Sequence, residues 1–199
     1  MALMKGNNMN DSILVYGDSI AYGYGNNNQS WFDKLNFSEN KYKYAKNGET
    51  IENILEKITT DTNYYNTIII AVGINNLLQE SRKAEDFVNL SDVAKYNQIL
   101  EIAKQKADNV IIQSVLPVIE KGFPKQSWLE CPLYAFNITI EAFNKMIKFL
   151  SIKHNITYID AYEVFKTKNL QELYIDAVHL NSKGQKLLLE IYDKLFSNQ

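Results

Sequence analysis

The chain has 199 residues, of which 46% are hydrophobic and 22% charged, so it is long enough to bury a sizeable core. Its net charge of −2 argues against nucleic acid as a partner, because nucleic-acid binding requires a basic face. No apolar run reaches the roughly 18–20 residues of a membrane span, and the single cysteine, Cys131, excludes an internal disulfide framework.

The first ten residues, 1–10, are polar and lack the apolar segment of a signal peptide. We interpret them as a disordered leader that precedes a single domain over 11–199. The chain as given is therefore expected in the cytoplasm, although a secreted or periplasmic protein whose signal had been removed would have the same sequence. The sequence carries no signal for a particular oligomeric state.

Apolar runs that stop at glycine or turn residues predict strands, and apolar residues at helical spacing predict helices between them. In chain order, the predicted elements are a strand over 13–16, a short helix over 30–35, a strand over 42–45, a helix over 51–58 capped by Thr50, a strand over 67–72, a helix from Ser91 to 107, a strand over 110–115, a helix over 135–150, a strand over 156–159 and a last helix capped by Ser182. The segment 117–132 has no periodicity and is expected to be a long loop.

The alternation of strands and helices predicts a parallel sheet with right-handed crossovers. The run over 67–72 is apolar throughout, which is typical of a strand covered on both faces. We therefore expect an α/β protein with a three-layer flavodoxin-like fold, in which a five-stranded parallel sheet carries helices on both faces.

Polar and glycine residues follow three of the predicted strands, in the clusters Gly17-Asp18-Ser19, Asn47-Gly48-Glu49 and Gly73-Ile74-Asn75. Because the carboxyl ends of parallel strands lie at one edge of a sheet, we expect these clusters to converge. A fourth cluster, from Asp176 to His179, precedes the last helix and can fold back onto the same edge. Each cluster alone is also compatible with an ordinary turn or helix cap.

Together the clusters contain the groups that acyl transfer requires. The Ser19 hydroxyl becomes a nucleophile only when an adjacent base removes its proton, and His179 is the candidate base. Asp176 lies three residues earlier and would fix the imidazole tautomer. The N–H groups of Ser19 and Gly48 and the side-chain amide of Asn75 would stabilise the oxyanion.

These residues resemble the four sequence blocks of the SGNH hydrolases, also called the GDSL lipase/esterase family. The blocks are Gly17-Asp18-Ser19-Ile20 with Gly23, Gly48-Glu49-Thr50, Gly73-x-Asn75 and Asp176-x-x-His179. The resemblance implies a five-stranded flavodoxin-like fold and hydrolysis of carboxylic esters or thioesters without a cofactor. It assigns Ser19 as nucleophile, Asp176 and His179 as its triad partners, and Gly48 and Asn75 as oxyanion donors.

The chain departs from the family pattern at two positions. Ile20 replaces a leucine, which is a conservative change. Asn76 stands where the family often has aspartate, so we expect an altered hydrogen-bond network there with activity retained.

Competing motifs match less well. An α/β-hydrolase nucleophile elbow would need glycine at Ala21, and a dinucleotide fingerprint that starts at Gly23 would need glycine at Asn28. With two histidines and one cysteine, a zinc site is not expected. We interpret His154 as a surface or helix-capping residue, and Cys131 as a small apolar loop residue.

The sequence therefore predicts a serine esterase that forms an acyl-enzyme on small carboxylic esters or thioesters, such as a carbohydrate O-acetylesterase or a short-chain esterase. Its expected partner is a small-molecule ester or an acylated glycan, and no metal or cofactor is expected. The alternatives are a lysophospholipase or acyl thioesterase for longer chains, an acyltransferase to an alcohol, and a non-catalytic binding module. As a hypothesis, the loop over 117–132 and nearby aromatic residues form the pocket: Tyr22, Tyr24, Phe123, Trp128 and Tyr134.

Overall fold

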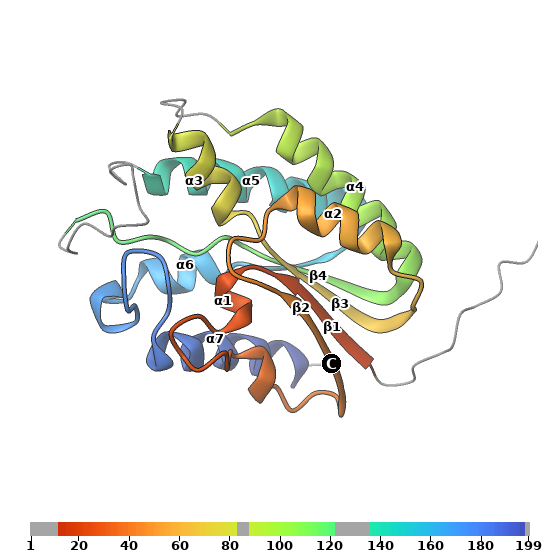
Figure 1. Cartoon of the computed structure of the whole chain (residues 1–199), viewed down its shortest axis with the longest axis horizontal. Helices are drawn as coiled ribbons and strands as arrows, with labels where there is room; N and C mark the ends of the chain where they lie inside the picture. The colour runs from red at the N-terminus through yellow and green to blue at the C-terminus, as the bar shows by residue number, and fades with distance from the viewer. Residues whose placement is uncertain (1–11, 83–87, 122–135, 198–199) are drawn as a thin grey trace, which may run out of the picture.

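The computed structural model describes residues 12–82, 88–121 and 136–197, which form a parallel five-stranded sheet covered by helices on both faces (Figure 1). The strand order is β2-β1-β3-β4-β5, which is the flavodoxin-like order. The strands are β1 (Ser12–Gly17), β2 (Asn40–Ala45), β3 (Tyr65–Ala71), β4 (Ala107–Gln113) and β5 (Thr157–Ile159). The predicted fold class is confirmed.

Strand β1 is central because its side chains are apolar on both faces. Residues 13–16 are completely buried, whereas the edge strand β2 has only exposed or half-buried residues. At the carboxyl end of β1, Gly17 pairs with Ala45 of β2 and with Ala71 of β3. The loops that follow these three strands therefore leave the sheet side by side.

The helices divide into two layers (Figure 1). One face of the sheet is covered by α2 (Ile51–Thr60), α3 (Ile74–Arg82), α4 (Leu90–Lys106) and α5 (Phe136–His154). The other face is covered by α1 (Ser19–Tyr22), the 3-10 helix Phe32–Lys34, α6 (Ala161–Lys166) and α7 (Ser182–Phe196), while a second 3-10 helix, Leu170–Glu172, precedes α7.

The alternation of side chains along β1 divides the core between these layers. Leu14 and Tyr16 pack towards α2 and α4, whereas Ile13 and Val15 pack towards the other layer. In that second layer the Trp31 ring stacks on Tyr192 of α7 with centroids 3.9 Å apart.

The predicted helix starts are wrong by one residue at two caps. Asn181 caps α7 and accepts hydrogen bonds from Lys183 N and Gly184 N, where Ser182 was expected to cap. Likewise, Asn89 caps α4 and accepts from Ser91 N, so the helix begins before Ser91. Asparagine and serine are similarly good caps, so the sequence alone does not distinguish neighbouring candidates.

The sequence did not predict three of the α-helices, which are α1, α3 and α6. Helix α3 begins at Ile74, directly after Gly73, within a segment that the sequence analysis treated as a turn. Helix α6 has six residues and is capped by Asp160. Both start immediately after strand ends, where turn and cap residues have the same composition. The predicted leader over 1–10 lies outside the described residues, as does most of the predicted loop, 122–132.

Candidate active site

Ser19 lies at the carboxyl edge of the sheet, where β1 turns into α1. The Asp18 side chain caps this helix and accepts a hydrogen bond from Ile20 N at 3.0 Å. Helix α1 packs so closely against the strand that a Cβ at Gly17 would lie 2.5 Å from the Ala21 Cβ. The glycine is therefore required by this sharp strand-to-helix turn, which places Ser19 as the first residue of the helix.

His179 and Asp176 lie in the loop that precedes α7, and this loop folds back onto the same edge. The imidazole Nε2 is 3.0 Å from Ser19 Oγ, although the two residues are 160 positions apart. On the other side of the ring, Nδ1 is 2.7 Å from Asp176 Oδ2. The predicted convergence of these three side chains is found in the structure as one continuous hydrogen-bonded series.

The Asp176 carboxylate is held by its own loop. Its Oδ1 accepts hydrogen bonds from Val178 N at 2.8 Å and His179 N at 2.7 Å, so both oxygens have partners. Burial raises the pKa of this carboxyl, but the hydrogen bond and charge of His179 and the backbone N–H groups outweigh burial, so the net shift of the pKa is downward. Asp176 is therefore an anion at neutral pH and favours Nδ1 as the protonated imidazole nitrogen.

An aromatic side chain packs against the histidine. The Tyr24 ring lies with its centroid 4.3 Å from that of His179. Tyr22 is half-buried, with the Lys43 ammonium group 5.9 Å from its ring centroid. Of the aromatic residues expected to form a pocket, Tyr24 thus contacts the site, and the three at 123, 128 and 134 lie outside the described residues.

The two remaining predicted site residues follow β2 and β3. Gly48 is exposed and has a φ of +77°, in the left-handed region that favours glycine. The Asn75 side-chain amide donates a hydrogen bond to the backbone oxygen of Glu49 at 2.8 Å. This bond ties the β2–α2 loop, which carries Gly48, to the amino end of α3, which carries Asn75.

The next residue, Asn76, is hydrogen-bonded to the start of α2, which follows the same loop. Its Oδ1 accepts a hydrogen bond from Ile51 N at 2.8 Å, and its Nδ2 donates to Glu52 Oε2 at 2.9 Å. Glu52 is ion-paired with Lys95 of α4. Burial opposes ionisation of Glu52, but hydrogen bonds from Lys95 and Asn76 outweigh it and lower the pKa to about 2. The changed hydrogen-bond network expected at Asn76 thus includes Glu52 and Lys95, whose participation has no signal in the sequence.

Asp18, the residue before Ser19, is a buried acid in the first sequence block to which no catalytic role was assigned from the sequence. Burial raises the pKa of its carboxyl to about 6, against the opposing effects of the Ile20 N–H group and the His179 charge. The folded state therefore binds this proton more tightly than the unfolded state does. The resulting stabilisation is complete below pH 3.8 and is lost as the pH rises from there to about 6.

We expect Asp18→Asn to remove this pH dependence. Asparagine keeps an oxygen that can accept from Ile20 N, and it carries no charge. Relative to wild type, the free energy of unfolding of the variant should increase by about 3 kcal/mol between pH 3.5 and pH 7, which is the value of a pKa rise from 3.8 to about 6. Urea unfolding at both pH values measures this difference, because the other acids titrate alike in the two proteins. An equal difference at both pH values would contradict the assignment.

Within the described residues, no group of three or more His, Cys, Asp or Glu side chains is arranged to hold a metal ion. His154 lies in the last turn of α5, where its Nε2 is 2.8 Å from Asn97 Oδ1. In the same described ranges, every helix is too short or too polar to cross a membrane.

A parallel α/β sheet with a serine, a histidine and an aspartate hydrogen-bonded in series at its carboxyl edge is an arrangement found in serine hydrolases. The sequence model of the GDSL-like lipase/acylhydrolase family matches residues 15–187, and the chain belongs to this family. The protein is accordingly an ester-bond hydrolase, as the resemblance implied. Among curated proteins none matches the chain in sequence.

Solved structures with the same fold include two acetyl xylan esterases. The acetylxylan esterase from Geobacillus stearothermophilus is 16% identical, with a TM-score of 0.70 over 94% of each chain. The acetyl xylan esterase AlAXEase is 14% identical, with a TM-score of 0.72 over 92% of this chain and 98% of its own. At these identities the likeness establishes the fold.

Proposed function

We propose that the protein is a carbohydrate O-acetylesterase that forms an acetyl-enzyme on Ser19. The observation that carries the proposal is the hydrogen-bonded series from Ser19 Oγ through the His179 ring to Asp176. The similar folds of the acetyl xylan esterases support a sugar acetate as the substrate. Catalytic mutants of the Geobacillus enzyme replace a serine, an aspartate or a histidine by alanine, which are the residue types of this series.

In the first half of the reaction, Ser19 Oγ attacks the acetyl carbonyl carbon while His179 Nε2 takes the hydroxyl proton. The tetrahedral intermediate then expels the sugar oxygen, which takes that proton from His179. In the second half, water attacks the acetyl-serine ester and gives its proton to the same nitrogen. Collapse of the second intermediate releases acetic acid and restores Ser19 with its proton.

The remaining groups stabilise charge in this cycle. Asp176 accepts from His179 Nδ1 and stabilises the imidazolium that forms in each step. The N–H group of Ser19 has no partner within its helix, because it belongs to the first turn of α1. Together with the N–H group of Gly48 and the amide of Asn75, it would donate to the oxyanion. The second amide hydrogen of Asn75 serves this role, since the first is used by Glu49 O.

The surroundings of Ser19 favour a short acyl group in the substrate. Ser19 is only 3% exposed, so little of its side chain is open to a bulky substrate. The Tyr24 ring lies against the imidazole. The low exposure of Ser19 and the ring beside His179 therefore support a small acyl group over a chain of several carbons.

A series of p-nitrophenyl esters tests this preference. We expect kcat/KM to fall by about tenfold or more from acetate to butyrate and further to octanoate, because each methylene that is not accommodated loses its burial and meets steric resistance. Release of acetate from acetylated xylo-oligosaccharides provides the matching measurement on a glycan. A rise towards octanoate would instead favour the lysophospholipase or thioesterase alternative.

A further inference from the structure

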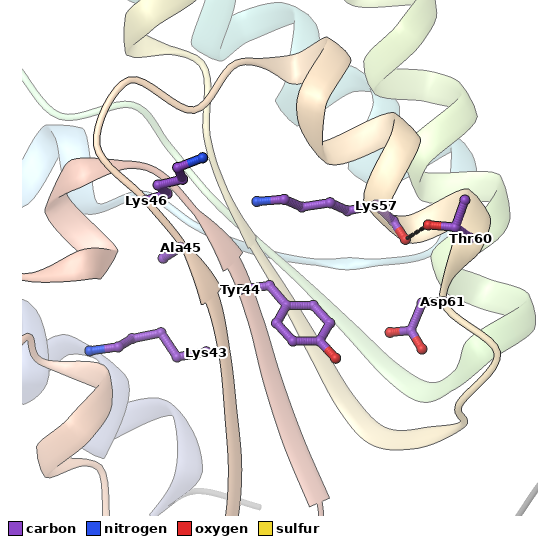
Figure 2. A pocket seen from close by; sticks show the side chains of 7 residues that line it. All are labelled: Lys43, Tyr44, Ala45, Lys46, Lys57, Thr60 and Asp61. Atoms are coloured by element: carbon purple, nitrogen blue, oxygen red, sulfur yellow. Dashed lines mark hydrogen bonds between the residues drawn. The ribbon is translucent and has the colours of Figure 1, made fainter.

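A groove runs beside the edge strand β2, at the side of the sheet covered by α2 (Figure 2). Its cavity measures about 440 Å³ and is lined by Lys43, Tyr44, Ala45, Lys46, Lys57, Thr60 and Asp61. None of these residues belongs to the series formed by Ser19, His179 and Asp176.

Two ammonium groups face each other across this groove. The side chains of Lys46 and Lys57 extend from opposite walls and point towards one another (Figure 2). Lys57 Nζ forms an ion pair with the buried Glu49 Oε2 at 3.0 Å, and because an ammonium group has three N–H donors, this contact leaves donors for a further acceptor. Within the described residues, the side chain of Lys46 makes no ion pair or hydrogen bond, although its backbone oxygen accepts from Glu49 N. Glu49 is therefore the ion-pair partner of Lys57, whereas the Lys46 side chain has no such partner among the described residues, and an anion between the two ammonium groups would reduce their repulsion.

The third lysine of the groove, Lys43, already bonds other groups of the protein. Lys43 extends away from the other two (Figure 2), and its Nζ bonds Asp33 Oδ2 at 2.7 Å and the backbone oxygens of Tyr22 and Asn28. Lys46 and Lys57 are therefore the cations offered to a ligand.

An aromatic ring and an acid complete the groove. Tyr44 is 39% exposed, and its ring is held by the buried Tyr16 ring at a centroid distance of 5.6 Å. Both carboxylate oxygens of Asp61 are already occupied by hydrogen bonds, from the hydroxyl groups of Tyr16 and Tyr65 and from Asn63. A fixed, exposed aromatic face beside polar groups suits a sugar ring, because the C–H face of the sugar packs on the aromatic face while its hydroxyls reach the polar groups.

The groove lies next to the residues that form the active-site edge of the sheet. Ala45 in its wall pairs with Gly17, two residues before Ser19. Lys46 lies two residues before Gly48, and the partner of Lys57 is Glu49, whose backbone oxygen accepts from Asn75. A substrate that extends from Ser19 past the Gly48 loop would enter the groove.

We propose that this groove binds the carboxylate of a uronic acid residue in an acetylated glycan, between Lys46 and Lys57 and with a sugar ring on Tyr44. The proposal rests on the proposed function, since it names the kind of glycan that the same site deacetylates. Two partly exposed lysine–carboxylate contacts correspond to about a five- to tenfold preference for the acidic glycan.

Binding to an inactive variant tests the groove without turnover. In the Ser19→Ala background, calorimetric titration compares two unacetylated xylo-oligosaccharides that differ only in one glucuronate side group. We expect the acidic one to bind about five- to tenfold more tightly, and roughly 0.5 M NaCl to abolish the difference by screening. Lys46→Gln should reduce the difference to about twofold or less. Lys186→Gln, which removes the same charge from an exposed position on α7, should leave it intact.

Equal affinities for the two oligosaccharides would overturn the proposal, and so would a preference for the acidic one that Lys46→Gln leaves unchanged. Tighter binding of an acidic peptide than of the glucuronate oligosaccharide would also overturn it. The proposed function fails by a different result: wild type that hydrolyses p-nitrophenyl acetate but releases no acetate from either acetylated oligosaccharide. The titration uses no acetyl group, so it tests glycan binding in the groove independently of that outcome.

Discussion

Ser19→Ala is expected to lower kcat for p-nitrophenyl acetate on the order of 10⁵-fold or more, the scale seen when the nucleophile of a serine hydrolase is removed. Alanine lacks the oxygen that would attack the carbonyl, and His179 would then have no hydroxyl proton to accept. Steady-state rates with enzyme at high concentration measure the residual activity. A fluorophosphonate probe should label the wild type at Ser19 and leave the variant unlabelled.

The fold should survive this substitution, because only a hydroxyl bonded to His179 is lost. Ser197→Ala is the matched control: Ser197 is exposed beyond the end of α7, and its replacement should change neither the rate nor the labelling. If Ser19→Ala kept wild-type turnover with an unchanged Tm, Ser19 would not be the nucleophile.

Asp176→Asn is expected to lower kcat by about 10³- to 10⁴-fold while the protein remains folded. The asparagine oxygen can still accept from Val178 N and His179 N, which maintains the loop. Its NH₂ group then faces His179 Nδ1 and donates to it, which moves the imidazole proton to Nε2. In that tautomer Nε2 cannot accept the proton of Ser19, so the base is lost although every side chain stays in place.

Labelling and turnover of Asp176→Asn should decline together, because both require deprotonated Ser19. Asp193→Asn is the matched control, since Asp193 is exposed on α7 and far from the series. Turnover within about threefold of wild type would show that the Asp176 carboxylate does not set the tautomer of His179.

The elements that sequence analysis predicted best are those with a strong local pattern. The strands β1 and β3 contain unbroken apolar runs, over 13–16 and 68–71. Helix α2 has Thr50 as its cap and Ile51, Ile54 and Ile58 on one face. The short helices α3 and α6 lack such a pattern, because their first residues also serve as turns after strands. Helix boundaries at Asn89 and Asn181 were missed by one residue, since neighbouring asparagine and serine residues compete equally well as caps.

The active-site residues were predictable for a different reason. Gly17, Gly48 and Gly73 each mark the end of a predicted strand, and a parallel sheet collects such ends at one edge. The cationic groove had no comparable signal. Lys46 and Lys57 lie on different elements, and their relation depends on how α2 packs beside β2 (Figure 2).

The sequence by itself determined the strand-and-helix order, the sheet class and the identity of the polar clusters, because periodicity and turn chemistry are properties of neighbouring residues. Only the tertiary structure decided that His179 Nε2 lies 3.0 Å from Ser19 Oγ, that Asp18 is buried enough to raise its pKa, and that two lysines face one groove. These properties depend on distances between residues far apart in the chain, and such distances are set by strand register, helix packing and exclusion of water.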